Sequence, residues 1–127
     1  MISLVRVPPP EIEEVPEFQE EFAEISDKFN SFPKDFERFK AVLEAKLPRY
    51  PNGTYPIEGL GGGVACPVYK VKDFRLECLK SKGKRSGIRI IYAYNSNENK
   101  IIFLELYHKN QKSNNDNGRI YRYLNGA

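Results

Sequence analysis

The chain has 127 residues, of which 40% are hydrophobic and 13% aromatic, so we expect one compact domain with a modest core. No apolar run approaches the roughly 20 residues of a membrane-spanning helix, and the N-terminal MISLVRVPPP lacks the charged start and apolar stretch of a signal peptide. We therefore expect a cytoplasmic protein that does not contact a membrane.

The net charge of +3 is unevenly distributed along the chain. Residues 1–48 contain eleven acidic and six basic residues, whereas residues 49–127 contain six acidic and fourteen basic ones, a net charge of about +8. A charge of this size favours a polyanionic partner for the C-terminal part. It is also compatible with an ordinary solvated surface.

The cysteines and the single histidine suggest no metal site. Cys66 and Cys78 are separated by eleven residues, which is not a zinc-ligand spacing, and His108 completes no ligand motif. We expect no metal and no cofactor, and we expect both thiols to be reduced and structural. They would face each other if they lay on adjacent strands, which the sequence leaves open.

The N-terminal half predicts a helix hairpin. Residues 1–10 end in three prolines and are expected to form a tail, and residues 11–127 a single domain, which begins with a short edge strand before Pro16. Two apolar stripes at helical spacing, dominated by phenylalanine and leucine, then predict helices over residues 17–29 and 33–47. The loop between them is short, so the helices should pack antiparallel, with the aromatic stripes in the core.

The next part of the chain leads into a sheet. Residues 49–63 are too rich in glycine and proline for a long element, and the triple glycine lacks the Lys-Ser or Lys-Thr of a phosphate-binding loop, so we interpret it as a connection. Residues 68–73 alternate, with Tyr69 and Val71 on one face and Lys70 and Lys72 on the other. Residues 75–79 continue this strand or form another.

Two central strands are expected after the basic loop at residues 80–87. Residues 88–94 and 100–108 are apolar on both faces, apart from Arg89 in the first of them. Burying an unpaired guanidinium is costly, so Arg89 must meet a carboxylate or face a functional surface.

The chain ends with a polar loop at residues 110–118 and then a last helical turn or short strand at residues 119–124. The order of elements predicts an α+β fold, with the N-terminal helix hairpin packed on one face of a twisted, mainly antiparallel four- to five-stranded sheet. If Tyr69 and Val71 contact the helices, Lys70 and Lys72 lie on the other face.

A Tyr-Lys-x-Lys strand, a Gly-x-Arg-x-x-Tyr segment and an apolar strand ending in Tyr-His-Lys follow one another in VYKVKDFRL, KRSGIRIIYAY and IIFLELYHKNQKSNNDNGRI. They are preceded by EFQEEFAEISDKFNSFPKDFERFKAVLEAKLP, which contains the predicted hairpin. In this order and spacing the segments, roughly residues 12–124, resemble the RelE-type toxins of the RelE/ParE toxin–antitoxin superfamily.

The resemblance implies an endoribonuclease toxin that cuts messenger RNA in the ribosomal A site without a metal and is silenced by a cognate antitoxin protein. In such a reaction the 2′-hydroxyl attacks the adjacent phosphate while a base removes its proton. An acid protonates the 5′-oxygen, and cations stabilise the charge that develops on the phosphate. The implied partners are mRNA, the ribosome and an acidic antitoxin segment.

By position, the resemblance matches Lys70 and Lys72 to the family's basic strand, Arg89 to its phosphate-stabilising arginine, and His108 and Lys109 to its acid or base. Glu105 falls on the opposite face from His108, which argues against a Glu–His pair. Further RNA contacts are expected from the basic loop and the C-terminal region, at Lys82, Lys84, Arg85, Lys112, Arg119 and Tyr121.

Each assignment has an ordinary alternative. The lysines can be solvated surface residues, the lone His108 can be structural, and Tyr92 and Tyr107 can be core rings. Two other functions also stay open: a superfamily member that poisons a protein target such as gyrase, and a non-catalytic RNA- or ribosome-binding domain. A cationic face with His108 and Lys109 beside it favours the nuclease, whereas a face without a working acid and base favours the others.

Overall fold

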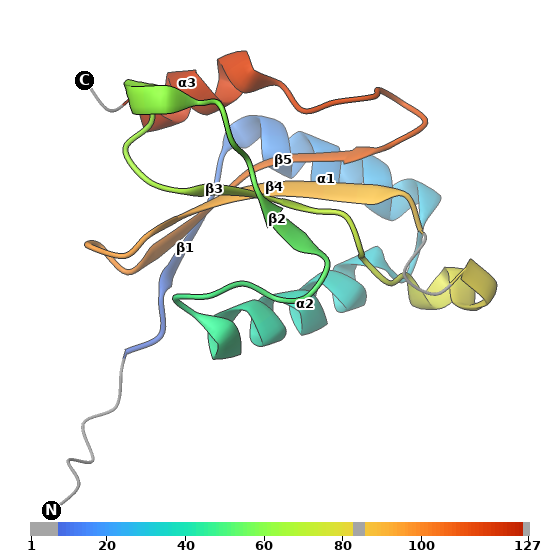
Figure 1. Cartoon of the computed structure of the whole chain (residues 1–127). Helices are drawn as coiled ribbons and strands as arrows, with labels where there is room; N and C mark the ends of the chain where they lie inside the picture. The colour runs from blue at the N-terminus through green and yellow to red at the C-terminus, as the bar shows by residue number, and fades with distance from the viewer. Residues whose placement is uncertain (1–7, 83–85, 126–127) are drawn as a thin grey trace, which may run out of the picture.

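The protein is built around a mixed β-sheet that has helices on both sides (Figure 1). The computed structural model describes residues 8–82 and 86–125, and within them no helix is long and apolar enough to cross a membrane. The elements in chain order are β1 (Glu11–Glu14), α1 (Pro16–Lys28), α2 (Phe32–Lys46), β2 (Thr54–Pro56), η1 (Gly61–Gly63), β3 (Val68–Val71), η2 (Glu77–Lys82), β4 (Ile88–Asn95), β5 (Lys100–His108) and α3 (Asn117–Leu124).

The sheet has the strand order β1-β5-β4-β3-β2. β1 is parallel to β5, and all other neighbouring strands are antiparallel. The prediction of an α+β fold with a mainly antiparallel sheet beside a helix hairpin is thus confirmed, and so is the short edge strand before Pro16.

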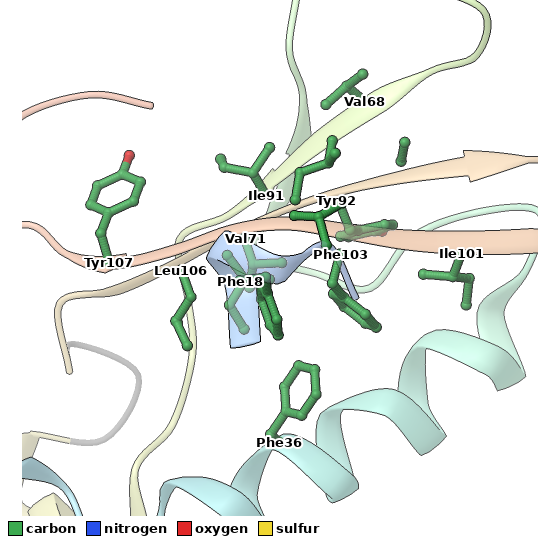
Figure 2. Close-up of a cluster of buried hydrophobic side chains, with 14 of the residues drawn as sticks. Phe18, Phe36, Val68, Val71, Ile91, Tyr92, Ile101, Phe103, Leu106 and Tyr107 are labelled. Carbon is green, nitrogen blue, oxygen red and sulfur yellow. The ribbon is translucent and has the colours of Figure 1, made fainter. Parts of the chain in front are cut away.

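The helix hairpin covers one face of the sheet, which we call the helix face. A proline stands at the start of each helix, where its missing N–H has no intrahelical partner to lose. Phe18 of α1 and Phe36 of α2 meet Phe103 of β5, with ring centroids 5.4 Å and 4.9 Å away. Figure 2 shows these rings together on the side of the strands that faces α2. The phenylalanine stripes therefore form the core, as expected.

The opposite face of the sheet, which we call the second face, begins with the alternation in β3. Tyr69 stacks on Tyr92, and Val71 is buried on the helix face, so Lys70 points to the second face as predicted. Figure 1 shows α3 on this side of the sheet, away from α2.

One residue of β5, Leu104, has no partner in β4. The register runs Tyr92↔Phe103 and then Ile91↔Glu105, so Leu104 is the extra residue of a β-bulge. Beyond the bulge the side chains exchange faces: Tyr107 lies opposite Arg89 on the second face, and the next residue along β5 points to the helix face. Figure 2 shows the Tyr107 ring pointing away from α2.

An ion pair replaces the missing strand neighbour of β5 beyond the bulge. β1 ends opposite Phe103, so the next backbone groups of β5 have no strand beside them. The Leu106 N–H donates to Glu21 Oε1 (3.1 Å), and the Leu104 carbonyl accepts from Arg119 Nη1 (3.0 Å). Glu21 and Arg119 also bind each other through two contacts of 2.8 Å and 3.1 Å. This pair therefore closes the sheet edge and joins α1 to α3.

The expectation of a strand at residues 75–79 is wrong. The chain turns there into η2, because side chains near the start of α2 take the backbone donors that a strand would use. The Glu77 N–H donates to Asp35 Oδ2 (3.0 Å), and the Cys78 N–H donates to Ser31 Oγ (2.9 Å). Cys78 is consequently not on a strand beside Cys66, and both thiols are free.

The end of the described chain is helical rather than extended. Asp116 caps α3 by accepting the Arg119 N–H at 3.1 Å, a common way to satisfy a free donor at a helix start. Ile120 and Leu124 are buried. The helical alternative for residues 119–124 is therefore confirmed.

We predict that Glu21→Ala lowers the free energy of unfolding by about 2–4 kcal/mol, because it leaves Arg119 without its carboxylate and the Leu106 N–H without an acceptor. Urea denaturation measures the loss. Glu20→Ala, at the neighbouring exposed position, is the matched control and should change stability by less than about 0.5 kcal/mol. The double variant Glu21→Leu, Arg119→Met should be more stable than Glu21→Ala, and equal losses from Glu20→Ala and Glu21→Ala would contradict the role of the pair.

Candidate functional site

Three cations gather on the second face where β3 ends beside β4. Arg89 Nη1 donates to the carbonyl of Lys72 (3.1 Å) and to that of Ile88 (3.2 Å), which ties the guanidinium across the two strands. Lys70 lies on the same face, opposite Ile91, which is two residues beyond Arg89 in β4. Among the residues that the structure describes, none of the three cations forms an ion pair with a carboxylate. We call Lys70, Lys72 and Arg89 the cation cluster.

Lys70 has a lowered pKa. Partial burial lowers its pKa, and the positive charges of Lys72 and Arg89 lower it further, while Glu105 acts in the opposite direction. Its ammonium donates to Asn114 Oδ1 at 3.0 Å. A lysine with a lowered pKa is more readily neutral, and a neutral amine can accept a proton.

Glu105 fastens the loop after β5 over the second face. Its side chain is only 1% exposed, and it accepts the Asp116 N–H at 2.8 Å and binds the Lys112 ammonium. That ammonium also lies 5.0 Å from the centroid of the Tyr107 ring. Lys112, predicted to contact RNA, is therefore paired inside the protein. No sequence signal identified this use of Glu105.

Tyr107 is buried on the same face, beside Arg89. Burial raises the pKa of its hydroxyl, and the Glu105 carboxylate raises it further, whereas Arg89 lowers it. The phenol therefore keeps its proton near neutral pH and is available as a hydrogen-bond donor.

His108 lies on the helix face, away from the cation cluster. Its ring stacks on Phe29 at a centroid distance of 5.9 Å. Nδ1 accepts the Asn110 N–H (3.0 Å), and Nε2 lies 3.0 Å from the Ser86 carbonyl, which can only accept, so the proton is on Nε2. Gly87 packs directly against this ring with a φ of +87°. The structure thus does not bring His108 together with Lys70 or Arg89.

The other predicted site residues are dispersed. Lys109 is exposed at the end of β5, and its backbone N–H donates to the Gly87 carbonyl at 2.9 Å. Arg119 is held by Glu21, whose hydrogen bond and charge raise its pKa despite the opposing effect of burial. Tyr121 donates its hydroxyl to the Leu60 carbonyl at 3.3 Å. Lys84 and Arg85 lie outside the described residues, and so does the side chain of Lys82.

A polar groove of about 260 Å³ adjoins the cation cluster. It runs between β2 and the loop that Glu105 holds, and sequence reasoning missed it because its two sides are about 60 residues apart in the chain. The only signals of this groove in the sequence were Tyr55 next to a proline and the asparagine-rich run at residues 114–117. The groove is lined by Tyr55, Pro56, Ile57, Glu58, Lys70, Lys72, Asn114, Asn115 and Asn117.

Comparisons with known proteins leave the site to be interpreted from its own residues. No protein family, curated protein or solved structure matches this chain. The resemblance to RelE-type toxins therefore stays a prediction. Within residues 8–82 and 86–125, no three His, Cys, Asp or Glu side chains come together in a way that could hold a metal ion.

We predict that Gly87→Ala costs about 2–4 kcal/mol of stability, because the new Cβ would lie 2.6 Å from His108 Nε2 and the backbone is in the left-handed region. Gly59→Ala is the matched control: its φ is +81°, but no atom lies within 4 Å of the added Cβ, so only the backbone cost of about 1 kcal/mol remains. Denaturation curves should show that Gly87→Ala costs less in a His108→Ala background. Equal costs in both backgrounds would contradict the packing of His108 on Gly87.

Proposed function

We propose that this chain is a RelE-type toxin that binds and cleaves messenger RNA on the second face of its sheet. The supporting observation is the cation cluster, in which Lys70, Lys72 and Arg89 converge without a carboxylate partner among the described residues. Positive charges that are left unpaired in one place suit a phosphate group. On this proposal the protein works in the cytoplasm, on ribosome-bound mRNA.

The cation cluster can supply most of the chemistry of 2′-hydroxyl attack. Arg89 and Lys72 bind the scissile phosphate and stabilise the negative charge that develops on it. The neutral form of Lys70, which its lowered pKa makes more accessible, takes the 2′-hydroxyl proton while the 2′-oxygen bonds to phosphorus. The bond to the 5′-oxygen then breaks, and this oxygen takes a proton from the Lys72 ammonium or from water. We assign the proton acceptor to Lys70 rather than to His108, since both ring nitrogens of His108 are bonded within the protein.

The same cations suit the antitoxin that the resemblance implies. An acidic segment laid across the second face would pair with Lys70, Lys72 and Arg89 and exclude RNA by occupying its site. Silencing would then require no change in the fold.

A second candidate is a non-catalytic RNA-binding domain. The observation that favours it is the position of His108, because the described part of the cationic face carries no imidazole. Binding would need only the cation cluster and exposed rings.

We predict that Lys70→Met abolishes RNA cleavage but weakens RNA binding by less than about fivefold, whereas Arg89→Ala abolishes cleavage and weakens binding by about tenfold or more. Cleavage is measured by mapping new 5′ ends in cellular mRNA after induction, and binding by fluorescence anisotropy on purified protein. Lys34→Ala, an exposed lysine of α2, is the control and should change neither.

The same experiment separates the candidate functions. RNA binding that Arg89→Ala weakens, without cleavage by the wild type, would establish the binding domain instead. Growth arrest without RNA binding or cleavage would indicate a protein target. Cleavage that survives in Lys70→Met would refute the role of this lysine.

A pH profile tests the assignment of Lys70 as the base. Its pKa is lowered, and the base must be unprotonated, so the cleavage rate should rise with pH until that pKa is passed and then level off. Lys72→Gln removes one of the charges that lower this pKa, so the rise should shift to higher pH in that variant, in which water protonates the 5′-oxygen. Single-turnover rates on a short RNA from about pH 6 to 10 measure the shift. An unshifted profile would contradict the assignment.

A further inference from the structure

The groove beside the cation cluster offers a ring on which a nucleobase can stack. Tyr55 of β2 lies directly opposite Lys70 of β3, so both side chains are on the second face. The tyrosine is 50% exposed, and the Lys72 ammonium lies 5.5 Å from the centroid of its ring. An exposed aromatic ring next to phosphate-binding cations is the arrangement by which proteins hold single-stranded RNA.

The facing side of the groove carries amide groups. Asn115 Nδ2 donates to Asn117 Oδ1 at 2.6 Å, and Asn114 Oδ1 accepts from Lys70 and from the Asn115 N–H. Within the described residues, Asn115 Oδ1 and the Asn117 amide nitrogen form no hydrogen bond. An amide acceptor and an amide donor that line the same groove can bind the edge of a base.

Two further features indicate a base rather than a second phosphate. Glu58 lines the same groove, and its carboxylate would repel a phosphate but can accept hydrogen bonds from a base amino group. The amide-bearing loop is also held in place, because buried Glu105 binds both Lys112 and the Asp116 N–H. A groove whose walls are fixed before binding loses less entropy when a ligand enters.

We infer that this groove binds the base of a nucleotide next to the phosphate held by the cation cluster. The base stacks on Tyr55, and the Asn115 and Asn117 amides read its edge, which gives the RNA contact a base preference. This inference rests on the proposed RNA contact and adds to it a site that distinguishes bases.

The test measures anisotropy of short RNA strands in which 2′-deoxy nucleotides prevent cleavage. The proteins are the wild type, Tyr55→Ala, Tyr55→Phe, Asn115→Ala with Asn117→Ala, and Arg89→Ala, each checked for folding by circular dichroism. The strands are the four homopolymers and a series in which one abasic position is moved along the chain.

We expect Tyr55→Ala to weaken binding of intact RNA by about tenfold and Tyr55→Phe to leave it unchanged, because the ring face supplies the stacking. One abasic position should weaken wild-type binding by a similar factor and leave Tyr55→Ala unaffected. The double asparagine variant should narrow the differences in affinity between the homopolymers.

Other results overturn the inference in distinguishable ways. If Arg89→Ala weakens binding but Tyr55→Ala does not, the RNA contact stands and the base site is refuted. If Tyr55→Ala weakens intact and abasic strands equally, the ring acts only by positioning Lys72, and the base site is again refuted. If the wild type binds none of the strands, the proposed function fails together with the inference.

Discussion

A single extra residue in β5 decides which side chains share a face of this sheet. Leu104 has no partner in β4, so the strand exchanges faces at this point. With Phe103 in the core, an uninterrupted strand would bring His108 to the second face beside Arg89 and Lys70. The bulge instead brings Glu105 and Tyr107 there, and His108 packs on Phe29 at the helix face. The chemistry available on the second face is therefore a consequence of backbone register.

The bulge also determines which cations are free. β5 loses its strand neighbour at the same point, and Glu21 with Arg119 takes over the hydrogen bonds of Leu104 and Leu106. Glu105, now on the second face, binds Lys112. The carboxylates near β5 thus neutralise Lys112 and Arg119, whereas the cations on the β3–β4 side have no such partner within the described residues. On the second face, positive charge without a carboxylate partner among the described residues is therefore concentrated in Lys70, Lys72 and Arg89.

The position of these cations indicates how a bound RNA strand would lie on the second face under the proposed function. The cation cluster would hold a phosphate, which positions a strand without reading its sequence. Tyr55 and the asparagine loop adjoin the cluster on the β2 side, where a neighbouring base would lie. Glu105 links the two regions, because the loop that carries Asn115 and Asn117 is fastened to it. Phosphate binding and base selection would thus depend on the same buried carboxylate.

Features that depend on local periodicity could be predicted from the order of residues alone. The apolar stripes of phenylalanine and leucine predicted the helix hairpin, and the alternation of Tyr69, Lys70 and Val71 placed Lys70 on the face away from it. The faces of the side chains within β5 could not be predicted in this way, because a strand that is apolar on both sides carries no alternation from which a bulge could be recognised. Contacts between segments that are distant in the chain could not be predicted from the sequence either. Hydrogen bonds to Asp35 and Ser31 hold the start of residues 77–82 outside the sheet. Tyr55 lines a groove together with asparagines about 60 residues further along the chain. Such pairs form only when the chain has folded.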